Sequence, residues 1–387
     1  MKIFFSICLA ALTLAIITGC NIHFTGSSGW SDADLKATTN LVGSATIPGG
    51  LKVLDVNNAF GAIHVTGSDS GPFGWTQKLT VRAATVVDVQ VFASNLVCQA
   101  NFAGDRLRLA VTVPSSKEPH SFQSDLEITV PNSVNVRTHD QYGRTEITGL
   151  NGDVEVANQF GAVELRDLPG NVRAETSYAA LKLTRTGSAT LKNAFGAIEA
   201  FDVHGPLAAE TSYGTLDARD IGGTVKLRNQ FGRVNVERAG ETDVKTSYAD
   251  LRVKEITGDV RLVNQFGRLM AEAITGSVRA ETSYAVMEVT GSGADFICIN
   301  QFGAINVQAT SAALTKLEAR TSYAALKVRL PADLKPVLQA HTSYGNIDSD
   351  FPVLVKPSGS DVLAGPSAGA PHINLQNQNG SIRVVRE

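Results

Sequence analysis

The sequence predicts an all-β protein: a parallel β-helix (β-solenoid) of about 18-residue rungs with an N-terminal strand-rich cap region. Three observations support this fold class. An aromatic residue recurs at nearly constant spacing, apolar residues recur at fixed distances from it, and mostly polar residues lie between them. An apolar-polar alternation with a period of two is typical of a β-strand that buries one face.

The recurring aromatic residue usually follows Asn-Gln or Thr-Ser and precedes Gly or Ala. Its spacing is 17 or 18 residues as far as Phe302 and 21 residues in the last two steps. Tyr and Phe alternate until the last step, so the sequence repeat is about 36 residues and holds two structural units. The series comprises Tyr142, Phe160, Tyr178, Phe195, Tyr213, Phe231, Tyr248, Phe266, Tyr284, Phe302, Tyr323 and Tyr344.

Four apolar columns accompany the aromatic residue, three and five residues after it and four and six residues before it. Around Phe160 these positions hold Val163, Leu165, Val156 and Val154. Two short strands cannot bury their own apolar face, so we expect units to stack about 4.8 Å apart and to bury like against like. A helical pair does not fit in so short a repeat, and a propeller blade needs about 40 residues, so both are excluded.

Two polar columns support the stacking. Asn and Thr alternate two residues before the aromatic, and we expect each side chain to hydrogen-bond its copies in neighbouring units while satisfying turn backbone. Three residues before the aromatic, the charge of the side chain alternates in sign, and attraction between opposite charges on neighbouring strands stabilises their pairing slightly. This charged column begins with Glu175, Lys192, Glu210 and Arg228.

The stacked aromatic residues form a ladder with two interpretations. An exposed ladder would make a stripe that holds a glycan or a peptide, whereas a buried one would fill a corner of the coil. Ring stacking is favourable in both cases. Because exposed Phe has little reason to recur, the alternation of Phe with Tyr favours corner packing.

The N-terminus carries an export signal. Lys2 precedes an apolar run from Ile3 to Ile17, which is too short to span a bilayer, and Gly19-Cys20 closes it. This pattern resembles the bacterial lipobox, which implies cleavage before Cys20 and lipid attachment to that residue. A plain signal peptide and a membrane anchor are the alternatives. We expect a lipoprotein signal peptide over residues 1–19 and a polar tether over residues 20–46.

The remaining chain divides by its pattern. Residues 47–131 read as an N-terminal strand-rich region and cap, since 76–130 alternate like ordinary antiparallel strands and a solenoid needs its ends covered. Residues 132–387 form the repeat β-solenoid, with a loop at 356–371 that is rich in Pro, Gly, Ser and Ala. Residues 379–384 look like a final unit without its aromatic.

A family resemblance covers about residues 50–387. It rests on the lone early Phe60-Gly61-Ala62-Ile63-His64-Val65, on the strand region ending in Ile128-Thr129-Val130-Pro131, and on the tandem Asn-Gln-Phe-Gly and Thr-Ser-Tyr-Ala units. Together these resemble the putative-adhesin family of bacterial β-helix proteins. The resemblance implies binding at the cell surface but names neither a ligand nor a binding residue.

Composition excludes several classes of function. Loss of Lys2 with the signal changes the formal net charge from −3 to −4, and no basic block exists, so we expect no nucleic-acid partner. Cys98 and Cys298 remain once Cys8 is cleaved off and Cys20 is lipidated, and we expect both to be buried free thiols. No nucleotide, metal or hydrolase signature is present, so we expect no cofactor, no metal and no enzymatic activity.

One acidic cluster is the candidate surface-binding site. Glu199 and Asp217 share an outward column on adjacent units, and Asp202 and Asp220 share another. Stacking would bring the first two to about 5 Å, a separation that retaining glycosidases use, and the group could also bind calcium. Interleaved arginines such as Arg219 favour a solvated charged face instead.

Three hypotheses of function follow. The leading one is a membrane-anchored envelope lipoprotein, at the outer membrane or cell surface, whose rigid face binds an extended glycan or protein partner. The second is a self-associating envelope scaffold, which an exposed apolar terminal unit would favour. The third is a polysaccharide-active β-helix enzyme, for which only the Glu199 cluster offers paired acids.

Overall fold

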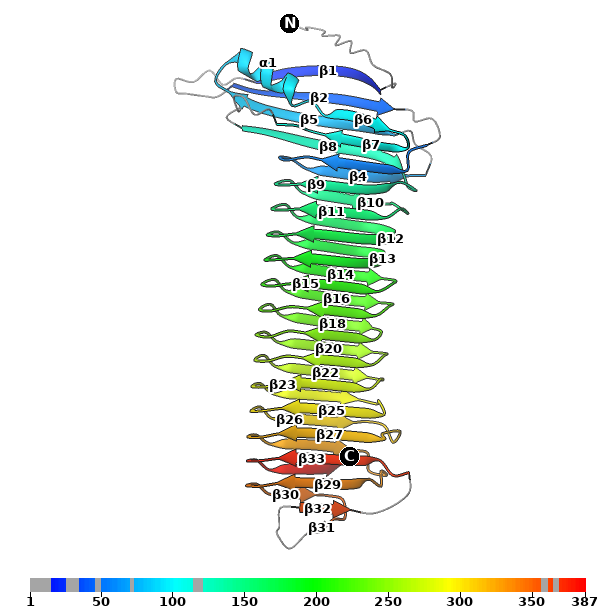
Figure 1. Cartoon of the computed structure of the whole chain (residues 1–387), viewed down its shortest axis with the longest axis vertical. Coiled ribbons are helices and arrows are strands. Elements are labelled where there is room, and N and C mark those ends of the chain that lie inside the picture. The colour runs from blue at the N-terminus through cyan, green and yellow to red at the C-terminus, as the bar shows by residue number, and fades with distance from the viewer. Residues whose placement is uncertain are drawn as a thin grey trace. The chain divides into compact units, whose positions relative to one another are not determined.

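The computed structural model describes residues 15–25, 35–45, 50–69, 73–113, 121–355, 361–364 and 369–387. It confirms the predicted parallel β-solenoid: strands of successive rungs lie side by side with a nearly constant register (Figure 1). The chain divides into two compact units, residues 1–196 and 197–387, which are described separately.

The first unit contains the cap and the early rungs. Its elements are β1 (Ala15–Thr25), β2 (Leu35–Ala45), β3 (Val53–Asn57), β4 (Ile63–Ser68), β5 (Gly74–Ala83), α1 (Val86–Asn95), β6 (Gln99–Ala103), β7 (Arg106–Ala110), β8 (Ser121–Pro131), β9 (Asn135–Asp140), β10 (Thr145–Thr148), β11 (Val154–Asn158), β12 (Val163–Thr176) and β13 (Leu181–Asn193).

The second unit is built from rungs and their terminal cover. Its strands are β14 (Ile198–Val203), β15 (Leu207–Thr211), β16 (Leu216–Ile221), β17 (Val225–Arg228), β18 (Val234–Ala239), β19 (Thr242–Lys245), β20 (Leu251–Ile256), β21 (Val260–Val263), β22 (Leu269–Ile274), β23 (Val278–Thr282), β24 (Met287–Gly291), β25 (Asp295–Asn300), β26 (Ile305–Ala309), β27 (Lys316–Thr321), β28 (Leu326–Leu330), β29 (Val337–Thr342), β30 (Ile347–Ser349), β31 (Leu354–Val355), β32 (Asp361–Ala364), β33 (His372–Asn377) and β34 (Ile382–Arg386).

The predicted apolar columns form the core of both units. In the first unit Val163 pairs with Leu181 and Val154 with Val172, each one rung apart, and the strands are parallel. In the second unit Leu251 lies between Val234 and Leu269. These side chains are buried, so the period-two interpretation and its register are confirmed.

A column of left-handed residues was not predicted. Seven residues after the aromatic, φ is +53° to +58° at Asp167, Arg185, Asp202, Asp220, Arg238, Glu255 and Ala273. The bend turns the next residue inward, so Leu168, Val203 and Ile221 join the core as a fifth apolar column. Glycine, the usual residue for this conformation, does not occur in the column, although Asp, which also adopts it, occupies three of the seven positions.

The cap of the first unit is a twisted antiparallel addition to the rungs. β8 pairs with β4 in parallel, and then β5, β2 and β1 follow in antiparallel order. Helix α1 covers β5, with Thr85 as its N-cap and Val89, Phe92 and Ala93 buried against Leu79. The expected strand-rich cap is thus present, but residues 86–95 are helical because their buried positions follow a helical spacing.

The predicted polar tether is wrong for residues 35–45, which form β2. Its Thr39 and Leu41 are buried, and the strand takes the free edge of β5. Residues 1–14 of the predicted signal peptide lie outside the described residues, as do residues 26–34 and 46–49 further along the chain. The main chain at Cys20 belongs to β1.

The C-terminal rung lies inside the stack of the second unit. β33 pairs with both β27 and β29, and β34 with both β28 and β30, so the last strands separate two earlier rungs (Figure 1). We predicted a final unit here, but not its insertion. Glu387 is held by Arg329 at 3.0 Å and by Gln308 at 2.9 Å.

The predicted loop at 356–371 is interrupted by a strand. β32 pairs with β29 in antiparallel order and with β31, so it covers the outer edge of β29. An uncovered strand edge is a template for pairing with other chains, which explains why this segment is ordered as a strand. Residues 356–360 and 365–368 lie outside the described residues.

Candidate functional site

The aromatic residues form exposed ladders, so the expectation of buried corner packing is wrong. In the first unit Phe60, Tyr142, Phe160, Tyr178 and Phe195 stack with centroids 4.8–5.0 Å apart. In the second unit the stack runs from Tyr213 to Tyr323, at 4.8–5.2 Å. These residues are 37–55% exposed. The buried Asn and Thr beside them fill the corner instead.

Each ladder presents ring edges and not ring faces. A flat ligand between two rings needs about 4.5 Å to each of them, or about 9 Å from ring to ring. The rings of the stacks lie only 4.8–5.2 Å apart. Sugar rings, nucleobases and cations therefore cannot reach the faces of the inner rings. The second ladder ends at Tyr323, because the C-terminal rung lies between the rungs of Tyr323 and Tyr344 and has Asn379 at the aromatic position. Tyr344 therefore has no ring beside it on that side and is 81% exposed.

The Asn column holds the turns together. Asn264 is buried, and its Nδ2 donates to the carbonyl of Ala249 one rung away at 2.9 Å and to that of Gly267 at 2.7 Å. Its Oδ1 accepts from the backbone N–H of Gln265 at 2.8 Å. The predicted satisfaction of turn backbone is confirmed, but it runs through carbonyls of the neighbouring turn and not through copies of the same side chain.

Asp140 breaks this column in the first unit. It occupies the buried position two residues before Tyr142, where other rungs hold Asn or Thr. Its Oδ1 accepts from the backbone N–H of Gln141 at 2.7 Å. Burial raises the pKa of this carboxyl from its ordinary 3.8 to about 6.

We expect Asp140→Asn to stabilise the protein at pH 8 and to change little at pH 4. The folded state holds a proton that the unfolded chain releases above pH 3.8, so stability falls as pH rises towards 6 and stays lower above it. Two pKa units correspond to up to about 3 kcal/mol. Thermal unfolding of both proteins from pH 4 to pH 8 tests this, and an equal gain at both ends would contradict it.

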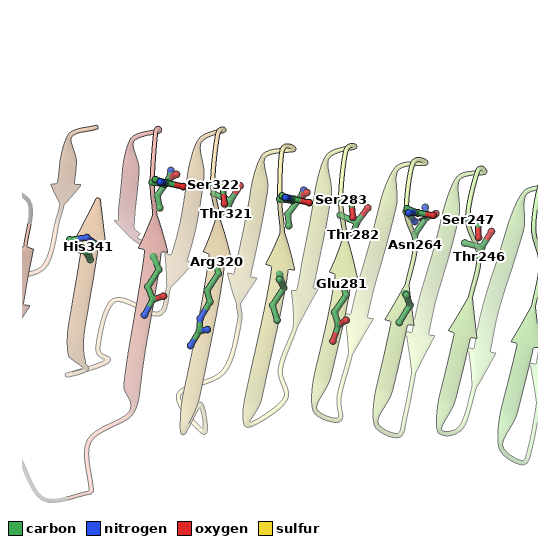
Figure 2. Close-up of a pocket in the computed structure, with 18 of the residues that line it drawn as sticks. Thr246, Ser247, Asn264, Glu281, Thr282, Ser283, Arg320, Thr321, Ser322 and His341 are labelled. Atoms are coloured by element: carbon green, nitrogen blue, oxygen red, sulfur yellow. Dashed lines mark hydrogen bonds between the residues drawn. The ribbon is translucent and has the colours of Figure 1, made fainter. Parts of the chain in front are cut away.

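A polar groove runs beside the aromatic ladder of the second unit (Figure 2). Its volume is about 810 Å³, and its wall repeats the two residues that precede each aromatic position. Buried Thr and Asn form the inner part, and Ser and Gln alternate along the outer part. The alternating residues are Ser247, Gln265, Ser283, Gln301, Ser322, Gln378 and Ser343.

The groove crosses the strands and follows the stacking direction. Its lining comes from seven successive rungs, so it spans about 29 Å at 4.8 Å for each of six steps. Figure 2 shows Glu281 and Arg320 further down their strands, below the Thr and Ser positions. Arg279 holds Glu281 at 2.7 Å, and the outward Ile299 lies between these rungs.

The predicted acidic cluster is brought together, but arginines occupy part of it. Glu199 and Asp217 are register neighbours on β14 and β16, as expected. Arg219 binds Asp217 through Nε at 2.9 Å and through a terminal nitrogen at 2.6 Å. Arg238 binds Asp220 in the same two-point manner, at 2.6 and 3.0 Å. His204 lies 3.9 Å from Asp202.

The other candidate groups contribute no chemistry to the groove. Cys98 and Cys298 are buried free thiols, as predicted, and burial raises the pKa of both to about 12. Across the ranges that the structure describes, no three His, Cys, Asp or Glu side chains gather as metal ligands. No helix within those ranges has the length and apolar composition needed to cross a membrane.

Sequence reasoning did not find the groove. Its signal was present, because Ser and Gln alternate one residue before the aromatic from Ser212 to Ser322, with the same period as Tyr and Phe. To predict a surface groove, one must know how far the turn residues project from the surface relative to the strand residues. A pattern of sequence columns does not contain that information.

The fold and the site define a parallel β-solenoid with a polar surface groove. No family model matches the chain, and no curated protein matches it.

Two solved structures align with the chain. A putative cell adhesion protein from Clostridium sporogenes aligns at 9% identity and a TM-score of 0.18, over 90% of this chain and 100% of that one. A putative adhesin from Bacteroides fragilis aligns at 12% identity and a TM-score of 0.17, over 90% and 97%. Both carry the adhesin description that the sequence resemblance suggested.

Proposed function

We propose that this protein is a lipid-anchored protein of the bacterial cell envelope that binds an extended polymer along its solenoid surface, as an adhesin does. The groove of the second unit carries this proposal. It continues over seven rungs and offers a repeating series of hydroxyl and amide groups, each able to donate and to accept hydrogen bonds. A compact ligand would fill only a small part of it.

The polymer site is tested by Gln265→Ala/Gln301→Ala, which shortens two exposed side chains of the groove. We expect about tenfold weaker binding of the polymers retained in a panel of polysaccharides and extended peptides. The control is Gln159→Ala, which removes the equivalent side chain of a rung in the first unit. Equal loss in the control would contradict the assignment, as would release of new reducing ends from a bound polysaccharide.

The lipid anchor is a separate part of the proposal and rests on the Gly19-Cys20 sequence. We expect Cys20→Ala to leave a soluble protein or an unprocessed precursor, because several acyl chains on one residue hold a protein at a membrane stably. Membrane fractionation and acyl labelling check this. Normal labelling and membrane retention of the variant would contradict it.

Self-association finds less support. End-to-end stacking would use the outer edge of the terminal rung, and β32 already occupies the part of that edge formed by β29. Strand edges covered in this way do not template pairing with another chain. We therefore place the binding role first and the scaffold role second.

A further inference from the structure

The outward face next to the groove carries a cationic patch, formed by Lys226, Arg228, Lys245 and Arg261. These residues lie on β17, β19 and β21, which are neighbouring strands of one sheet, and all four are exposed. Arg228 pairs in register with Lys245, so two cations lie directly beside each other across one rung step.

This arrangement breaks the pattern of the column. Glu210 and Arg228 continue the sign alternation, and Lys245 then places a second cation where an anion is expected. Like charges opposite each other on neighbouring strands are destabilising. Attraction between opposite charges therefore explains the charged column as far as Arg228. It does not explain the step from Arg228 to Lys245.

The patch cations have no carboxylate partner among the described residues, whereas several other cations of the second unit have one. Elsewhere in the second unit Arg219, Arg252 and Arg279 each lie within 3.2 Å of a carboxylate. Within the described part of the chain, no carboxylate lies within 4 Å of any patch cation. The one acid between them, Asp243, lies in register between Lys226 and Arg261.

The patch is continuous with the groove. Lys245 is followed in sequence by Thr246 and Ser247, which line the groove, and it pairs in register with Val263, which also lines it. A polymer in the groove would thus pass onto the four cations as it leaves. This continuity and the unpaired charge specify the sign of the ligand.

We propose that the polymer is an anionic polysaccharide, whose carboxylate or sulfate groups bind the cationic patch while its hydroxyls bind the Ser and Gln groups of the groove. This inference rests on the proposed polymer-binding function. The covered ring faces argue against single-stranded nucleic acid, which binds through stacking of its bases on aromatic faces.

The test compares polygalacturonate with its fully methyl-esterified form, which keeps the backbone and removes the charge. The purified full chain and two double variants are titrated with both polymers at low and at high salt. Arg228→Gln/Lys245→Gln removes two patch cations. Lys254→Gln/Lys327→Gln, on β20 and β28, makes the same change of charge away from the patch and groove.

We expect tight, salt-sensitive binding of polygalacturonate, weakened about tenfold for each patch cation removed and unchanged in the control variant. Equal binding of both polymers, lost on substitution of Gln265 and Gln301, would overturn the charge assignment and leave the proposed function standing. Failure to bind polygalacturonate would overturn the inference, and preferential binding of polyglutamate would assign the patch to acidic protein instead.

Discussion

Leu251→Asp is expected to unfold the second unit or to destabilise it by about 4 kcal/mol or more. Leu251 is 1% exposed and packs in a column between Val234 and Leu269. An aspartate there would lose the apolar contacts and bury a carboxylate without a partner. Urea unfolding followed by circular dichroism measures the change.

The neighbouring Arg252→Asp is the matched control. Arg252 points outward and lies 3.2 Å from Glu272, so this variant loses one exposed ion pair and gains a like-charge contact. Such exposed pairs contribute less than about 1 kcal/mol. Equal stabilities of the two variants would contradict the register on which the core assignment depends.

Asn264→Ala is expected to destabilise the second unit by about 3 kcal/mol, because three backbone groups lose their hydrogen-bond partner at once. These are the carbonyls of Ala249 and Gly267 and the N–H of Gln265. The loss should reach the site as well, since Asn264 and Gln265 line the groove. Calorimetry gives the first quantity and polymer titration the second.

Thr282→Ala makes the equivalent truncation in the next rung. Thr282 is buried in the same column, but its Oγ1 has no hydrogen-bond partner among the described residues. We expect a cost of about 1 kcal/mol, which is close to that of one buried methyl group. If both truncations cost the same, the column does not stabilise turns through hydrogen bonds.

The rung and its core could be predicted because they repeat. A residue such as Leu251 shares its column with ten others at the same offset, so chance agreement is excluded and the period-two alternation fixes which side is inward. The cap does not repeat, and its strands were predicted from the period-two alternation alone. Helix α1 was missed because Val89, Phe92 and Ala93 fit a helix only when the sheet beneath them is known.

The features that sequence did not predict depend on the order of the strands in the stack and on how far side chains project from the surface. The position of β33 between β27 and β29 reverses the order of the chain, which no periodicity records. The exposure of rings such as Phe266 depends on Asn264 filling the corner first. The patch at Arg228 and Lys245 was visible in sequence as a break in the sign alternation, but its lack of partners was not.

Affinity as a function of ligand length tests the central claim most directly. Oligosaccharides of one polymer, from a monomer to chains longer than the groove, are titrated against the purified protein. A groove of about 29 Å predicts affinity that rises with length until the ligand covers the seven rungs and then levels off. Binding of a monosaccharide or disaccharide as tight as that of the polymer would show a compact pocket, and would contradict binding along the solenoid surface.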